Sequence, residues 1–279
     1  KKYVAAESFT GGGYEAPATL KKISDYWFTQ GVNRIIFHTF THQPLDTKPG
    51  NAMVGTHIHR NITWADQATP FMTYLARNSF MLQQGKFVAD IAYLLDEGAP
   101  STMPFWGNGL QPEPPSGYDY DYINSDVLLN RIEVGKEGEL VLPNSNSYKV
   151  LVLPGNTAMS LDIIKKIAAL VKDGATVIGP KPKSAPGLEN YPAAEQKIQR
   201  ITTEIWGDLD GINRTIRYVN NGMIVWGESL PKILQKLGVE KDVEFSRELK
   251  TNISWIHRET KNADIYYISN QSDLRQELD

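Results

Sequence analysis

Cysteine is absent from this sequence, and its absence removes several kinds of chemistry at once. A chain of 279 residues without Cys forms no disulfide bond, no thiolate metal site and no cysteine nucleophile. The absence of Cys does not decide the cellular compartment, because many periplasmic proteins also lack Cys. The sequence begins with Lys1 and shows no signal peptide. We therefore expect a processed or excised piece of a longer protein, and the missing signal says nothing about secretion.

Long apolar runs and an excess of one charge are lacking as well. No apolar run approaches the roughly 20 residues that a membrane-spanning helix needs. A formal net charge of -3 provides no basic surface for a nucleic-acid backbone. We therefore expect neither a membrane nor a nucleic-acid partner. With 41% hydrophobic residues, the composition is that of a soluble globular protein with one large or two medium domains.

What is present begins with a short β-prone run that carries one carboxylate near its end. Glu7 stands just before the glycine turn 11–13. In (β/α)8 enzymes the catalytic groups lie where strands end and loops begin, and glycine lets the backbone leave a strand sharply. We interpret Glu7 as a catalytic candidate at the carboxyl end of a barrel strand. The alternative is a solvated carboxylate at a strand end.

A helix and a second strand follow this first strand. Apolar residues recur at helical spacing from Pro17 to Gly31, and a β-rich run covers residues 32–40. The order strand, helix, strand predicts parallel strands whose long loops lie on one face.

The long loop after the second strand is dense in imidazole, amide and aromatic groups. We predict a carbohydrate-binding surface, because a pyranose offers hydroxyls to polar groups and an apolar face to an indole. The candidate substrate-binding residues are His38, His42, His59, Arg60, Asn61 and Trp64. The alternative is a loop packed by its own aromatic residues. A zinc site at His57 and His59 is disfavoured, because no third ligand stands at a familiar spacing.

The pattern changes after a helix predicted over residues 66–84. A continuous apolar run over 87–95 is typical of a strand buried in a parallel sheet. Strands over 149–154 and 175–179, with a helix between them, predict an open doubly wound sheet. From residue 245 two alternating strands predict a β-hairpin, which either continues into a β-rich domain or packs on its neighbour. The predicted domains are 1–85, 86–244 and 245–279.

Six short motifs carry a family resemblance. They are VAAESFTG (4–11), NRIIFH (33–38), HQP (42–44), HRNITW (59–64), YLAR (74–77) and LQQG (82–85). Taken together they resemble the end of the catalytic module of α-L-rhamnosidases of glycoside hydrolase family 106, over about residues 2 to 180. The following domain resembles the class I glutamine-amidotransferase-like domain that comes after the barrel in this family and in family 42 β-galactosidases. Amidotransferase activity is excluded, because that fold needs a nucleophilic Cys.

The resemblance implies an α/β fold: the last units of a (β/α)8 barrel, then a flavodoxin-like, amidotransferase-like doubly wound domain, then the start of a β-rich segment. It implies hydrolysis of terminal α-L-rhamnosides with inversion by two carboxylates about 6.5–9.5 Å apart. Glu7 would be the general base, and the partner acid would come from an earlier strand. Glu97 is a second candidate carboxylate or a loop acid near a domain interface. The resemblance also implies calcium, for which no ligand set can be matched here, and a periplasmic or extracellular location.

Only two strands of an eight-stranded barrel can be counted before the second domain. We therefore expect a catalytically incomplete chain whose exposed edges pair with the missing remainder of the parent chain or with other copies in a homo-oligomer. Two other functions stay open. One is a family 42-like retaining β-galactosidase with Glu7 as nucleophile, about 5–5.5 Å from the acid. The other is a non-catalytic flavodoxin-like scaffold. A nucleotide-binding role is disfavoured, because no Gly-x-Gly-x-x-Gly motif follows a predicted strand.

Overall fold

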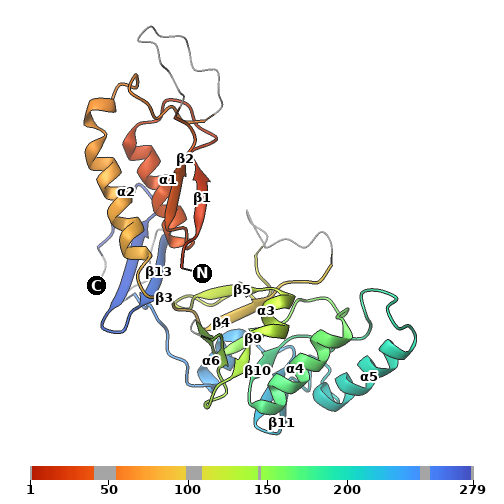
Figure 1. Ribbon diagram of the computed structural model, residues 1–279. Helices are drawn as coiled ribbons and strands as arrows, with labels where there is room; N and C mark the ends of the chain where they lie inside the picture. The colour runs from red at the N-terminus through yellow and green to blue at the C-terminus, as the bar shows by residue number, and fades with distance from the viewer. Residues whose placement is uncertain (1, 41–54, 99–108, 144–145, 246–251, 278–279) are drawn as a thin grey trace. The chain divides into compact units, whose positions relative to one another are not determined.

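The computed structural model describes residues 2–40, 55–98, 109–143, 146–245 and 252–277. It shows a mixed α/β protein whose chain forms two compact units (Figure 1). Unit 1 combines Lys1–Val88 with Phe245–Asp279, and unit 2 is Ala89–Glu244. Among the described residues, no helix combines the length and the apolar character needed to cross a membrane.

Unit 1 contains the βαβ arrangement that the sequence predicts. Its two parallel strands pair Glu7 with Ile36 and Ser8 with Phe37. The elements of unit 1 in chain order are β1 (Ala5–Ser8), α1 (Pro17–Thr29), β2 (Arg34–Phe37), the 3-10 helix η1 (Ala65–Gln67), α2 (Thr69–Leu82), β3 (Lys86–Phe87), β13 (Ile253–Glu259) and β14 (Asp264–Asn270). The helix predicted over 66–84 is thus a short η1 followed by α2, which begins where Pro70 occupies the first turn.

The core of unit 1 lies between the two strands and the two helices. Leu20 and Phe28 of α1 are fully buried, and Ile35 and Phe37 of β2 pack against the same cluster. The buried members from the other elements are Phe9, Ile58, Phe71, Leu75, Leu82 and Ile256. Buried or partly buried residues alternate with exposed ones along β1 and β2, and successive side chains of a strand point to opposite faces. The helices therefore cover only one face of the β1–β2 sheet.

The C-terminal hairpin completes unit 1. Strands β13 and β14 pair along seven residues each, and β3 adds to β13 through Phe87 opposite Arg258. The hairpin packs on α1 and α2. The hairpin thus packs on its neighbour, which is one of the possibilities left open by the sequence, and forms one compact unit with it.

The prediction of one continuous strand over 87–95 is wrong, because the backbone bonds to one sheet at the start of this run and to another sheet two residues later. Val88 donates its N–H to the carbonyl of His257 in unit 1. Two residues later Asp90 donates to the carbonyl of Asp119 in unit 2. The apolar run therefore supplies two strands to two different sheets.

Unit 2 is built on a sheet of six strands in the order β11-β12-β10-β9-β4-β5. Neighbours from β5 to β12 are parallel, and β11 is antiparallel to β12. The strands are β4 (Ile91–Leu94), β5 (Tyr120–Ile123), β9 (Val150–Val152), β10 (Thr176–Ile178), β11 (Ile216–Val219) and β12 (Gly222–Val225). The helices are α3 (Ser125–Asn130), α4 (Leu161–Asp173), α5 (Ala193–Trp206) and α6 (Leu230–Lys236), and a small sheet holds β6 (Glu133–Val134), β7 (Leu140–Val141) and β8 (Ser147–Tyr148).

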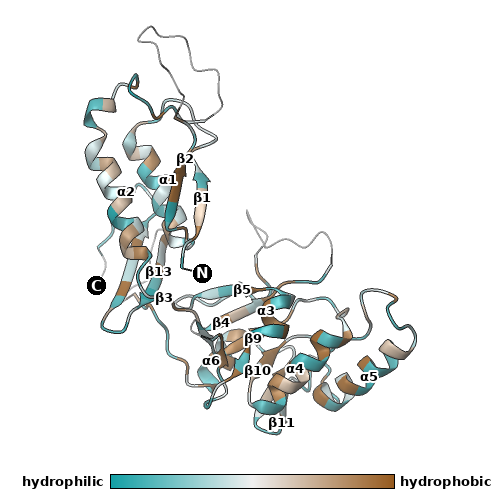
Figure 2. Cartoon of the chain, in the orientation of Figure 1, coloured by the Kyte–Doolittle hydropathy of each residue, from teal (hydrophilic) through white to brown (hydrophobic). Residues whose placement is uncertain are grey.

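The central strands of unit 2 are buried along their whole length. Every residue of β4, β9, β10 and β12 is buried, as expected for a parallel sheet covered on both faces. Figure 2 shows the largely hydrophobic colour of β9 and β10 and the mixed colour of α4. The predicted apolar strands and the predicted helix between them are therefore confirmed.

Candidate functional site

Glu7 lies on the face of the β1–β2 sheet that the helices leave uncovered. Ser8 is buried toward the helices, so its neighbour Glu7 points the other way and is exposed. The paired residue Ile36 is 51% exposed on the same face. The Thr10 hydroxyl donates a hydrogen bond to Oε1 of Glu7 at 2.5 Å. Glu7 is therefore an accessible carboxylate at the carboxyl end of a parallel strand, as the sequence predicts.

The loop after β2 is bonded to the turn after β1. Thr56 donates its N–H to the carbonyl of Phe9 at 2.9 Å, and His57 donates to the carbonyl of Gly13 at 2.8 Å. Thr39, just past β2, donates to the carbonyl of Thr56 at 2.9 Å. Residues 55–64 and the glycine turn thus form one hydrogen-bonded assembly at the carboxyl ends of β1 and β2, which we call the strand-end assembly.

Glu15 lies in the middle of this assembly, although the sequence analysis did not single it out. Its Oε2 lies 2.7 Å from the N–H of Gly13 and 3.0 Å from the hydroxyl of Thr56. Hydrogen bonds from its own N–H and from that of Gly13 lower the pKa of the Glu15 carboxyl, and Thr56 and His57 act in the same direction. The sequence signal for Glu15 is an acid placed directly between a glycine turn and a helix.

The imidazoles of the assembly differ in their surroundings. His57 is buried, with its ring 4.4 Å from that of Tyr14 and 5.8 Å from that of His59. Nδ1 of His59 accepts the N–H of Asn61 at 3.1 Å. Burial lowers the pKa of His59, and His57 and Arg60 lower it further, so its neutral form is favoured. A neutral imidazole can exchange hydrogen bonds with a sugar hydroxyl.

His38 lies at the end of β2, where its N–H donates to the carbonyl of Ser8 at 3.0 Å. Its Nδ1 is buried and has no hydrogen-bond partner in the part of the chain that the structure describes. That nitrogen faces Gly55, where an added Cβ would lie 2.3 Å away. Gly55 is therefore required by its positive φ of 120° and by this close approach.

Trp64 is tied to the assembly by its indole. Its Nε1 donates to the carbonyl of Glu15 at 3.2 Å, and its ring meets Phe71 edge-on at 6.1 Å. Of the predicted site residues, His59, Arg60, Asn61 and Trp64 belong to the loop of the strand-end assembly, while Glu7 and His38 lie at the carboxyl ends of β1 and β2, which this assembly follows. His42 lies outside the described residues.

A metal centre is not formed by the residues that the structure describes. Within them, no group of three or more His, Cys, Asp or Glu side chains could hold an ion. The carboxylate of Glu15 is engaged by hydrogen-bond donors, and that of Glu7 receives Thr10. These residues therefore gather no carboxylate ligand set for the calcium that the family resemblance implies, which stays a prediction for the longer protein.

Glu97 has a structural contact in unit 2. Its Oε2 accepts the N–H of Ser160 at 2.7 Å, where α4 begins, and Ser160 makes no side-chain cap of its own. Nearby, Nδ2 of Asn156 donates to Asp96 at 2.5 Å. Parallel sheets bind phosphates at such helix N-termini. Here a carboxylate already occupies the position, which disfavours a nucleotide site.

Replacing Glu97 by Ala is expected to destabilise the start of α4 by about 1 kcal/mol, the usual effect of losing a cap. The exposed carboxylate Glu189 provides a matched control, Glu189→Ala. Amide hydrogen exchange in the first turn of α4 is the measurement. Equal exchange in both variants would show that Glu97 does not cap the helix.

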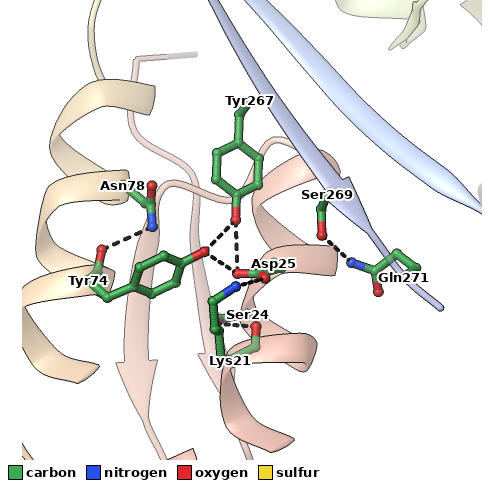
Figure 3. Close-up of polar contacts among 8 residues, drawn as sticks. All are labelled: Lys21, Ser24, Asp25, Tyr74, Asn78, Tyr267, Ser269 and Gln271. Atoms are coloured by element: carbon green, nitrogen blue, oxygen red, sulfur yellow. Dashed lines mark hydrogen bonds and ion pairs between the residues drawn. The ribbon is translucent and has the colours of Figure 1, made fainter. Parts of the chain in front are cut away.

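A second polar cluster in unit 1 joins α1, α2 and β14 (Figure 3). Asp25 of α1 is 6% exposed, and its Oδ1 lies 2.6 Å from the Tyr74 hydroxyl and 2.8 Å from the Tyr267 hydroxyl. Lys21 lies 2.5 Å from Oδ2. Burial raises the pKa of both tyrosines. Because its members satisfy one another, we interpret this Asp25 cluster as a link between α1, α2 and β14.

Comparison with known proteins identifies the family. The sequence model of the glycoside hydrolase family 106, alpha-L-rhamnosidase, matches residues 1–279. A Formosa agariphila protein, provisionally named a beta-glucuronidase, is 40% identical over 280 residues, which cover 99% of this chain and 22% of that protein. The solved structure of a rhamnosidase from Novosphingobium sp. PP1Y is 30% identical, with a TM-score of 0.81, over 96% of this chain and 26% of that one.

This chain thus spans about a quarter of each of these two proteins. The family expected from the six motifs is confirmed, and the match runs through both units. The chain belongs to glycoside hydrolase family 106, the alpha-L-rhamnosidase family.

Proposed function

We propose that this chain is part of a longer glycoside hydrolase that removes terminal α-L-rhamnosyl groups with inversion, and that Glu7 is its general base. The observation that carries the proposal is the place of Glu7, exposed at the carboxyl end of β1 on the uncovered face. Membership of family 106 and the similarity to a solved rhamnosidase support it.

The proposed architecture extends the observed topology. In unit 1 the β1–α1–β2–α2 order agrees with the last two units of a (β/α)8 barrel. The uncovered face, with Glu7 and Ile36, would then face the barrel interior. In unit 2 the five parallel strands, numbered along the chain, lie in the order 2-1-3-4-5, which is that of flavodoxin-like domains. This order supports the proposed amidotransferase-like domain.

The reaction assigns a proton transfer to Glu7. In an inverting glycosidase one carboxylic acid protonates the leaving oxygen, and a carboxylate on the opposite side takes a proton from the attacking water. The Thr10 hydroxyl holds Oε1 of Glu7. Within the described residues, Oε2 accepts no hydrogen bond, so it is the oxygen offered to the water. The acid belongs to another part of the parent chain.

The strand-end assembly would bind the sugar beside this base. Neutral His59 and the polar side chains of Arg60 and Asn61 can orient sugar hydroxyls, with His38 at the next strand end. Calcium enters no step here, because the described residues gather no ligand set for it.

The name of the Formosa relative points to a different glycoside, so the test compares substrates. The full-length protein is assayed on 4-nitrophenyl α-L-rhamnoside, β-D-glucuronide and β-D-galactoside, with and without a chelator. We expect cleavage of the α-L-rhamnoside, with β-L-rhamnose as the first product by proton NMR. Cleavage of the glucuronide alone would contradict the proposed substrate. α-L-Rhamnose as first product would make the enzyme retaining and Glu7 a nucleophile, and no cleavage of any glycoside would favour the scaffold.

A further inference from the structure

We propose that Glu15 is a positioning residue, which holds the glycine turn so that Thr10 orients Glu7 for catalysis. This inference rests on the proposed function, because it assigns Glu15 a part in the same reaction. Glu15 does not touch Glu7 in the structure, and its contacts lead to Glu7 through the turn.

Glu15 joins three stretches of chain, two through its carboxylate and one through its main-chain carbonyl. Its Oε2 receives the N–H of Gly13 in the turn and contacts the hydroxyl of Thr56 in the loop after β2. Its own carbonyl receives the indole N–H of Trp64. One residue thus fixes the turn, the start of the described loop and the aromatic residue at the loop's end.

The hydroxyl proton of Thr56 can be assigned. Oγ1 of Thr56 lies 3.0 Å from both the carbonyl of Phe9 and Oε2 of Glu15, and a hydroxyl donates only one hydrogen bond. The carbonyl of Phe9 already accepts the N–H of Thr56. Neither a carbonyl nor a carboxylate oxygen can donate, so the single hydroxyl proton serves one of the two acceptors at a time. We assign it to the carboxylate of Glu15, the charged and therefore stronger acceptor. Thr56 is 1% exposed, and a charge-assisted bond there is about twice as strong as a neutral one.

The turn is closed tightly around this carboxylate. A Cβ added at Gly12 would lie 2.2 Å from Oγ1 of Thr56 and 2.5 Å from Oε2 of Glu15. Gly12 also donates its N–H to the carbonyl of Phe9 at 3.3 Å. Thr10 lies inside this loop of bonds, between Phe9 and Gly12. The position of its hydroxyl, and hence its hydrogen bond to Glu7, therefore depends on the bonds that Glu15 makes.

The effect on catalysis follows from orientation. A general base acts only within hydrogen-bond reach of the proton it takes, and a displacement of about 1 Å can cost about 100-fold in rate. Glu15→Ala in the full-length protein is expected to lower kcat by about 10- to 100-fold. Glu15→Gln keeps an oxygen acceptor for Gly13 and should restore most of that loss.

The test combines Glu15→Ala with Thr10→Ala in a double-mutant cycle, on the glycoside that the wild type cleaves. If Glu15 acts through Thr10, the double variant will have nearly the kcat of Thr10→Ala alone. Asp66→Ala, an exposed carboxylate in η1, is the matched control and should keep the wild-type kcat. If Glu15→Ala does not fold, the same cycle is run with Glu15→Gln, whose smaller loss should also vanish in the Thr10→Ala background.

The outcomes separate this inference from the function on which it rests. An active wild type with unchanged kcat in Glu15→Ala, or with losses that multiply in the cycle, would overturn the role of Glu15 alone. A wild type that cleaves no glycoside would overturn the proposed function and this inference with it.

Discussion

Replacing Glu7 by Gln in the full-length protein is expected to lower kcat by about 100- to 10,000-fold, the contribution typical of a general base. Gln has the same shape and keeps an oxygen that can accept the Thr10 hydroxyl. It cannot take a proton from water. Because Glu7 is exposed, the variant should fold normally, with a change in unfolding free energy within about 0.5 kcal/mol. The measurement is kcat on the nitrophenyl glycoside that the wild type cleaves.

The control for Glu7 is a carboxylate in a similar setting. Glu259 is exposed at the end of β13 and pairs with Lys86 at 3.0 Å. Glu259→Gln should keep the wild-type kcat, because this pair lies on the hairpin sheet, whose inner side packs on the helices. A Glu7→Gln variant with the same kcat as Glu259→Gln would make Glu7 a structural carboxylate and move the base elsewhere.

The elements predicted best from the sequence are those whose pattern matches their surroundings. The helix predicted between the strands over 149–154 and 175–179 is α4, Leu161–Asp173, because its buried residues, among them Ile163, Ile167 and Val171, follow one face. The hairpin of β13 and β14 was also predicted. Burial alternates along β14, as its sequence pattern suggests, whereas β13 has three consecutive buried residues, Ile256–Arg258.

The errors arise where partners are chosen by distant parts of the chain. Strand β5 was not predicted, because its residues alternate Tyr and Asp and none but Ile123 is buried. Its place is set by parallel pairing with β4. The division of the 87–95 run has the same origin, since β3 joins a hairpin more than 160 residues away. No pattern within nine residues contains that information.

The candidate site shows the same limit at the level of single residues. The place of Glu7 at a strand end was predictable, because a carboxylate before a glycine turn marks such an end; its catalytic role stays a prediction. Glu15 was not, because its importance comes from Thr56, which is 41 residues away in sequence. The loop histidines were predicted as a group, and the structure distinguishes buried His57 from His59, whose pKa is lowered.

Among the substitutions that we propose in unit 1, loss of the Asp25 carboxylate should lower the free energy of unfolding the most. Asp25→Ala would remove the shared acceptor of the Tyr74 and Tyr267 hydroxyls (Figure 3). Because these hydroxyls lie 2.9 Å from each other, one can still donate to the other, and one loses its acceptor. Such a loss costs about 1–3 kcal/mol for a buried polar group, so we expect about 1–3 kcal/mol for the cluster. The Lys21 contact adds little, because this side chain is 49% exposed and solvent screens it.

The measurement must report on the hairpin, because unfolding of a multidomain protein is not a single transition. Amide exchange in β13 and β14 of the full-length protein should accelerate by about tenfold for each 1.4 kcal/mol lost in Asp25→Ala. Asp273→Ala removes a carboxylate that is 94% exposed and pairs with Lys22; its exchange should stay near that of the wild type. Equal exchange in the two variants would mean that apolar packing alone holds the hairpin.

The tyrosines give this cluster a pH dependence of known sign. Burial raises the pKa of Tyr74 and Tyr267 above the usual value, so the folded state favours the protonated phenols. Their contribution is complete below the unfolded-state pKa of about 10 and decreases as the pH rises above it. Hairpin exchange, corrected for its intrinsic dependence on pH, should therefore accelerate above about pH 10. Tyr267→Phe removes one of the two titrating groups and should weaken that acceleration. An unchanged pH profile in this variant would mean that the loss of hairpin stability at alkaline pH arises outside the Asp25 cluster.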